Sequence, residues 1–259
     1  MTRRFYLAWM VFPAMALLAG CVTSSSSPVK QKASPHKAAM YNTQLAIIYM
    51  QEGRMDLAQN KLAEALKQAP HLVDVHNAMA LYYERIGRVP AANHQYKLAL
   101  RYGDDDPNTL NNYGAFLCRQ GKYRESIRYF VKASNNIDYS TPDRALSNAG
   151  LCALKIPDKT LAKKYFQQAL AINNDLGQAL WQMGMLSFQD QDYIKANNYL
   201  ARLINVTQHP SARMLWVAIE AAWASGHQKN AEHYGRELLK RHPDSQEAQK
   251  FIQLVGSGS

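Results

Sequence analysis

A period of about 34 residues runs through the chain from Ala39 onward and constrains its fold more than any other feature. Small residues recur at position 8 of the period, namely Ala46, Ala80, Gly114, Gly150 and Gly184. Large apolar residues recur at position 24, namely Leu62, Tyr96, Phe130, Phe166 and Leu200. Small residues return at position 20, namely Ala58, Ala92, Ser126, Ala162, Ala196 and Ala231. Such self-similarity predicts stacked helical units, each of which buries its apolar face against its neighbours.

The small residues are expected where the two helices of one unit approach each other, because a bulky side chain there would push the helices apart. Glycine recurs in the turns "QEGRMD", "RIGRVP", "RQGKYR" and "ASGHQK", as a helix end in the left-handed conformation requires. Period, small positions and turns together resemble the tetratricopeptide repeat (TPR).

We predict an all-α, right-handed superhelical solenoid of six TPRs. The repeats are expected at 39–72, 73–106, 107–142, 143–176, 177–211 and 212–243, followed by a polar-faced capping helix at 244–255 and a flexible tail at 256–259. The sixth repeat fits less well, since Ile219 and Gly235 stand at positions 8 and 24. Two extra residues before the fourth repeat predict a wider junction there.

The N-terminal segment predicts export and lipid attachment. Arg3 and Arg4 precede an apolar run from Phe5 to Gly20 that is too short to span a bilayer, which is typical of a signal peptide at 1–20. Leu18-Ala19-Gly20-Cys21 resembles the bacterial lipobox, which implies a lipid on Cys21. The serine-rich stretch at 21–38 is expected to form a flexible tether. Because Val22 rather than aspartate follows the cysteine, the resemblance implies a lipid anchor at the periplasmic face of the outer membrane; the alternative is an uncleaved anchor with an incidental cysteine.

Composition and motifs point away from catalysis and nucleic acid. The net charge is +10 and the pI about 9.4, yet Lys and Arg are scattered singly and accompany no nucleic-acid motif. The sequence holds no zinc-ligand spacing, nucleophile elbow or phosphate loop, so we expect no enzyme activity, metal or cofactor. The acidic run Asp104 to Asp106 precedes Pro107 and is expected to cap a helix rather than bind calcium.

Cys118 and Cys152 are separated by one period, near the ends of neighbouring first helices. Behind a signal peptide the compartment is oxidising, and with Cys21 lipidated two thiols remain, so we expect a disulfide between them. Two small buried apolar residues are the alternative.

In the TPR family the first helix of each repeat lines a concave groove at positions 2, 5, 9, 12 and 13. The resemblance places in this groove Met40, Ile47, Met50, Asn77, Leu81, Trp181, Met185, Phe188, Trp216 and Trp223. A methionine-rich apolar groove predicts an amphipathic helix or extended peptide as its ligand, although packing between repeats is an alternative role for each residue.

The stretch "LNNYGAFLCRQGKYRESIRYFVKA" at 110–133, behind a lipobox and among six repeats, resembles the PilF/PilW family of type IV pilus biogenesis lipoproteins. These are outer-membrane pilotins, which help the pilus secretin reach the outer membrane and oligomerise. The resemblance implies a non-enzymatic adaptor whose partner is the type IV pilus secretin, and a monomer is expected from the size of the solenoid. A periplasmic TPR lipoprotein that serves outer-membrane protein assembly or peptidoglycan enzymes is the alternative.

Overall fold

The computed structural model describes residues 34–256, and within this range the regular structure is helical throughout. The expected signal peptide, Cys21, most of the tether and the last residues of the tail lie outside the described residues. The helices are α1 (Pro35–Gln51), α2 (Met55–Gln68), α3 (Val73–Arg85), α4 (Val89–Tyr102), α5 (Pro107–Arg119), α6 (Tyr123–Ser134), α7 (Pro142–Ala153), α8 (Lys159–Ile172), α9 (Gly177–Gln189), α10 (Tyr193–Val206), α11 (Ala212–Ala224), α12 (Gln228–Arg241) and α13 (Gln246–Gly256).

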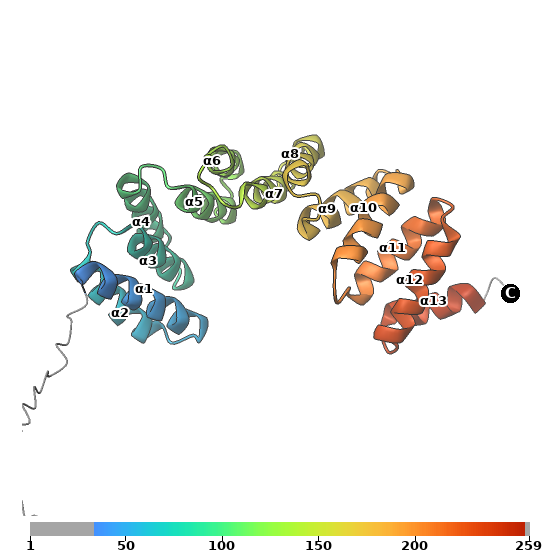
Figure 1. The fold of residues 1–259 in the computed structure, drawn as a ribbon, viewed down its shortest axis with the longest axis horizontal. Helices are drawn as coiled ribbons and strands as arrows, with labels where there is room; N and C mark the ends of the chain where they lie inside the picture. The colour runs from blue at the N-terminus through green and yellow to red at the C-terminus, as the bar shows by residue number, and fades with distance from the viewer. Residues whose placement is uncertain (1–33, 257–259) are drawn as a thin grey trace, which may run out of the picture. The chain divides into compact units, whose positions relative to one another are not determined.

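The first twelve helices form six hairpins, and consecutive hairpins stack on one another in chain order (Figure 1). Helices α3, α5, α9 and α11 begin at the residues where the sequence places the start of a repeat. Helix α1 begins earlier than expected, at Pro35, because proline is well tolerated in the first turn of a helix. The predicted all-α TPR fold is confirmed.

Within a hairpin, the large residue at position 24 lies directly on the small residue at position 8. A Cβ atom added to Gly150 would lie 2.7 Å from the ring of Phe166, and one added to Gly184 would lie 2.8 Å from Leu200. Phe166 and Leu200 are fully buried. The spacing of the two helices therefore depends on these glycines.

The sixth repeat inverts this arrangement, which explains its weak match to the period. Ile219 is large and fully buried at position 8, whereas Gly235 stands at position 24. The space above Gly235 is occupied by Phe251 of α13, whose ring would be 2.0 Å from an added Cβ. The inversion thus leaves the space in which Phe251 of the last helix packs.

The expected widening before the fourth repeat is wrong. Tyr139 lies in the loop that contains the two extra residues, and it is buried with Leu110, Ala133 and Ala145. Helix α6 also packs extensively against α7. Ile137 in the same loop is exposed to solvent. The insertion is therefore accommodated as a surface loop, without separating the repeats.

Gln191 occupies the turn of repeat five at φ 61°, whereas Gly53, Gly87, Gly121 and Gly226 adopt similar positive φ values in other repeats. Left-handed backbone is unfavourable for a residue with a Cβ, so Gln191→Gly should raise the free energy of unfolding by about 0.5–1 kcal/mol. Urea titration followed by circular dichroism measures the change. The reverse exchange, Gly121→Gln, should lower the free energy of unfolding. If Gln191→Gly were no more stable than the wild type, this account of the turn would be contradicted.

Candidate functional site

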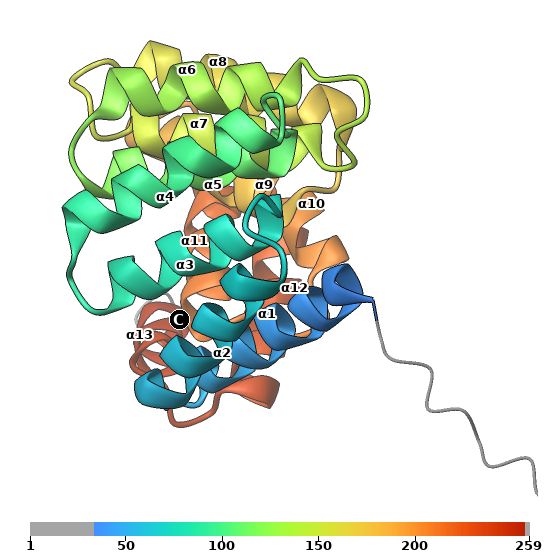
Figure 2. The ribbon, with the colours of Figure 1, turned by 90° about the vertical axis from the view of Figure 1, so that its left-hand side faces the viewer.

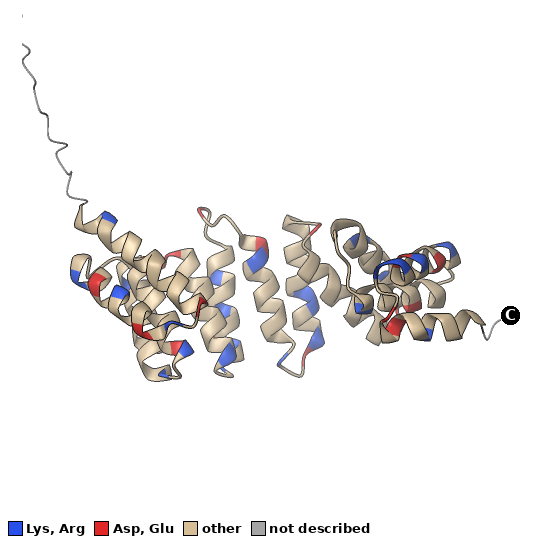
Figure 3. Cartoon of the chain, turned by 90° about the horizontal axis from the view of Figure 1, so that it is seen from below, with Lys and Arg blue, Asp and Glu red and all other residues tan. Residues whose placement is uncertain are grey.

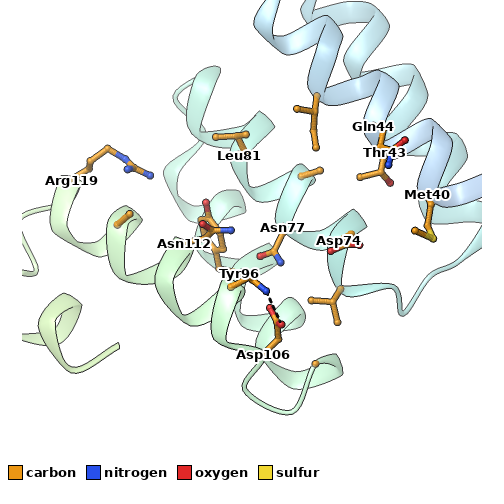
Figure 4. Close-up of a pocket in the computed structure, with 16 residues that line it drawn as sticks. Met40, Thr43, Gln44, Asp74, Asn77, Leu81, Tyr96, Asp106, Asn112 and Arg119 are labelled. Atoms are coloured by element: carbon orange, nitrogen blue, oxygen red, sulfur yellow. Dashed lines mark hydrogen bonds between the residues drawn. The ribbon is translucent and has the colours of Figure 1, made fainter. Parts of the chain in front are cut away.

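A groove of about 690 Å³ runs along α1, α3 and α5, the first helices of the three N-terminal repeats (Figure 4). Because three successive first helices contribute to it, the groove extends in the stacking direction. Its lining comprises Met40, Thr43, Gln44, Ile47, Val73, Asp74, Asn77, Ala78, Leu81, Tyr96, Gly103, Asp106, Asn108, Asn112, Ala115 and Arg119.

Apolar and polar side chains share the groove. Met40, Ile47 and Leu81 supply aliphatic and thioether surface from α1 and α3. Asn77 and Asn112 supply amides from α3 and α5. A lining of this kind suits a peptide that presents apolar side chains on one side and backbone polar groups on the other.

Arg119 is held at one end of the groove by Glu84. The Arg119 Nε and Nη2 atoms both donate to Glu84 Oε2, at 3.0 and 2.7 Å, and the hydroxyl of Tyr96 donates to Glu84 Oε1 at 2.7 Å. The Glu84 side chain is only 11% exposed. Burial, and next the bond to Glu84, raises the pKa of Tyr96, which therefore remains a hydrogen-bond donor. This network joins α3, α4 and α5 and fixes the guanidinium in the lining.

Asn77 connects α3 to α5 and leaves one atom unsatisfied. Its Nδ2 donates to Thr109 Oγ1 at 2.7 Å, and that hydroxyl donates to Asp106 Oδ2 at 2.8 Å. Asp106 also accepts the Thr109 backbone N–H at 2.7 Å, so it caps α5 as expected. Asn77 Oδ1 is buried and finds no partner within residues 34–256. An unpaired buried acceptor costs free energy, so Asn77 joins α3 to α5 with only part of its hydrogen-bonding capacity satisfied.

Four of the residues predicted for the groove line it together: Met40, Ile47, Asn77 and Leu81. Met50 does not, and its assignment was wrong. It is 1% exposed and packs with Ala58 and Leu62, because its position on α1 faces the hairpin partner α2. Trp223 also lies outside this groove, and its ring stacks on Phe251 of α13 at a centroid distance of 5.7 Å.

The remaining predicted groove residues lie in the C-terminal repeats and do not line this groove. They are half-buried against the main hydrophobic core, namely Trp181, Met185, Phe188 and Trp216. Conversely, the predicted positions omitted Gln44 and Asn112, which both occupy position 6 of their repeats. A helical wheel would have found them, because position 6 neighbours the groove-facing positions 2 and 9 on the helix surface.

The Sγ atoms of Cys118 and Cys152 are bonded, and the two Cα atoms lie 5.9 Å apart. The bond joins α5 to α7 beside Arg119, the last groove residue of α5. It therefore restrains the groove-lining helix α5 against the repeat that follows.

Charged residues are dispersed over the described helices, and Lys and Arg outnumber Asp and Glu (Figure 3). Among residues 34–256 no group of three or more His, Cys, Asp or Glu side chains could hold a metal ion. Nor is any helix in that range long and apolar enough to cross a bilayer.

Comparisons with known proteins agree with this architecture. A family model described as tetratricopeptide repeat matches residues 43–107. The chain is 30% identical over 245 residues to a Pseudomonas aeruginosa protein named type IV pilus assembly protein PilF, covering 94% of this chain and 97% of the relative.

Two solved structures share the fold at similar identity. The structure of Pseudomonas aeruginosa PilF has a TM-score of 0.69 at 28% identity, covering 85% of this chain and 99% of that one. The structure of PilW, described as a widely conserved type IV pilus biogenesis factor, has a TM-score of 0.66 at 27% identity, covering 83% and 98%.

A pH dependence follows from Glu220 on α11. Burial raises the pKa of this carboxyl, while Lys250, a hydrogen bond from Trp216 and Arg213 oppose the shift. The pKa of Glu220 is therefore higher in the folded protein than in the unfolded chain. At a pH between these two pKa values, folding takes up a proton, so the free energy of unfolding falls as the pH rises through this range. Because glutamine does not titrate, Glu220→Gln removes this loss of stability.

Glu220→Gln should therefore unfold at a higher urea concentration than the wild type at pH 7, and the two should converge below the usual pKa of glutamate. Urea titrations at pH 4 and pH 7 measure both. Glu232→Gln on α12, an exposed position, is the matched control and should show little difference. A lower stability of Glu220→Gln at pH 7 would contradict the assignment.

Proposed function

This chain belongs to the family of the type IV pilus assembly protein PilF, and we propose that it acts in type IV pilus biogenesis as a lipid-anchored pilotin for the pilus secretin. The observation that carries the proposal is the 30% identity that extends over 94% of this chain and 97% of PilF. A likeness of that extent includes every repeat, whereas the tetratricopeptide family model matches only residues 43–107.

The groove along α1, α3 and α5 supports a binding role. Its aliphatic residues can bury the apolar side of a partner segment. Arg119, held by Glu84, offers a cation at a fixed place for an acidic side chain or a carboxylate. In this proposal the groove shields an aggregation-prone segment of each secretin subunit until the subunits assemble.

The lipid anchor completes the proposed mechanism. Cys21 stands at the end of the lipobox-like Leu18–Cys21 stretch, and an acylated cysteine there would hold the protein at the periplasmic face of the outer membrane. Subunits bound to the groove would then accumulate at the bilayer in which they assemble.

The proposal is tested by deleting the gene and examining unheated outer-membrane extracts on gels with an antibody to the pilus secretin. We expect loss of the heat-resistant secretin multimer, restored by the wild-type chain and only weakly by Cys21→Ala. Normal multimers in the deletion strain would contradict the pilotin proposal. The partner would then be sought among the proteins of outer-membrane assembly or the cell-wall enzymes.

Groove variants in the same assay locate the function on the molecule. Met40→Glu places a carboxylate on the apolar lining at an exposed position that the fold tolerates, and should reduce the multimer about tenfold or more. Ile194→Glu on α10, exposed and outside the groove, is the matched control and should leave it unchanged. Equal activity of the two variants would place the binding surface elsewhere.

A further inference from the structure

A second hollow lies next to the groove, toward the C-terminal repeats. It measures about 580 Å³ and lies among α5, α7 and α9, the first helices of repeats three to five. Asn108 of α5 lines both this hollow and the groove, so the two are continuous. In Figure 2, which looks onto the N-terminal end of the array, α5, α7 and α9 lie below α6 and α8 and so share one side of it. We call the second hollow the amide pocket, after its polar lining residues Asn108, Asn111, Arg144, Asn148 and Gln178.

The amide pocket depends on the two residues inserted before repeat four. Residues 135–141, seven in number, separate α6 from α7, whereas four or five residues separate consecutive hairpins elsewhere in residues 34–256. Tyr139 and Thr141 of this longer loop line the pocket. Tyr139 is 7% exposed and packs with Leu110 of α5, so the loop is held in place. The pocket is therefore a feature of this junction rather than of the repeat.

Hydrogen bonds within the lining leave N–H groups available to a ligand. Asn148 Nδ2 donates to Asn111 Oδ1 at 3.1 Å, and the buried hydroxyl of Ser147 donates to Gln178 Oε1 at 2.8 Å. Both bonds occupy amide oxygens, and each joins two successive first helices. The side-chain N–H groups of Asn111 and Gln178 have no partner within residues 34–256. The pocket therefore offers donors whose positions are fixed by bonds between repeats.

The charge of the pocket favours an anion. Arg144 of α7 is exposed and forms no ion pair within residues 34–256. No carboxylate from these residues lines the pocket. Thr141 and Leu176, the N-caps of α7 and α9, also line it, and neither makes a side-chain capping bond, so both helix dipoles add to the positive potential. A carboxylate accepts hydrogen bonds only, so it matches a guanidinium surrounded by amide donors.

We propose, on the basis of the binding role proposed for the groove, that the amide pocket binds an acidic side chain of the same partner segment whose apolar side chains occupy the groove. The segment passes over α5 in an extended conformation, and its carboxylate pairs with Arg144. Its backbone carbonyls accept hydrogen bonds from the amides of Asn111 and Gln178. Continuity at Asn108 selects this occupant, because one chain can fill both hollows without a break.

The stacking of the helices sets the place of the acidic residue in that segment. Leu81 on α3 and Arg144 on α7 belong to first helices that contact α5 from its two sides. Packed helices lie roughly 8–10 Å apart, and an extended chain advances roughly 3.3 Å per residue, so two steps between helices correspond to about five or six residues. We therefore expect an Asp or Glu at about this distance from the partner residue that contacts Leu81.

The test begins with photo-cross-linking of the full chain in cells, with a photoreactive amino acid at Leu81 or, separately, at Gln178. Both positions should capture one partner, and mass spectrometry should map both adducts to one segment, with the acidic residue between the two sites. Capture of a segment by Leu81 but not by Gln178 would overturn the role of the amide pocket and leave the proposed function standing. The absence of any adduct from Leu81 would contradict the groove and the pocket alike.

Charge variants then test Arg144 directly. Arg144→Glu should lower the yield of the Leu81 adduct about fivefold or more, whereas Arg144→Lys should retain most of it. Arg128→Glu on α6 is the matched control, because Arg128 is exposed and lines neither hollow. This control should leave the yield of the Leu81 adduct unchanged.

A reversal of the pair separates recognition from a merely structural role of Arg144. Once the acidic residue of the partner is mapped, its replacement by lysine should restore the Leu81 adduct in the Arg144→Glu background. A yield from Arg144→Glu equal to that of the control, or a loss that lysine in the partner does not restore, would overturn the proposal.

Discussion

The close approach of the two helices within each repeat is the constraint on which the rest of the structure depends. It is achieved by seating a large residue on a glycine or alanine, as Phe166 sits on Gly150 and Leu200 on Gly184. The hairpins stack on one another, and in the N-terminal half the first helices α1, α3, α5 and α7 contact one another in turn. Where the rule is inverted, at Ile219 and Gly235, Phe251 of the single helix α13 occupies the space above the glycine.

Stacking of the first helices creates a surface that no single repeat possesses. The groove takes Met40 and Ile47 from α1, Leu81 from α3 and Arg119 from α5. Its polar groups are held by bonds between repeats, from Asn77 to Thr109 and from Arg119 to Glu84, so the lining is set before a ligand arrives. Such preorganisation favours binding, because less side-chain freedom remains to be lost on association.

The sequence predicted what is periodic and missed what depends on one particular contact. The repeat boundaries and the position of the cysteines follow from spacing, because each repeat is a local unit. Met50 was misassigned because its side chain packs with Ala58 and Leu62 of α2, a contact that the position numbers of the family do not specify. The stacking of Trp223 on Phe251 was missed because α13 lies outside the repeat period. The Glu84–Arg119 pair was missed since it joins residues from different repeats, whose side chains only the stacked structure brings within 2.7 Å.

The central claim is that the groove along α1, α3 and α5 holds a segment of the pilus secretin. The most direct measurement is photo-cross-linking in the cell, with a photoreactive amino acid at Leu81 in the groove and, separately, at Ile194 on α10. The account predicts an adduct between the chain and the secretin from the Leu81 position alone, mapped by mass spectrometry to one apolar secretin segment. An adduct with a different protein from Leu81, or a secretin adduct equally strong from Ile194, would contradict it.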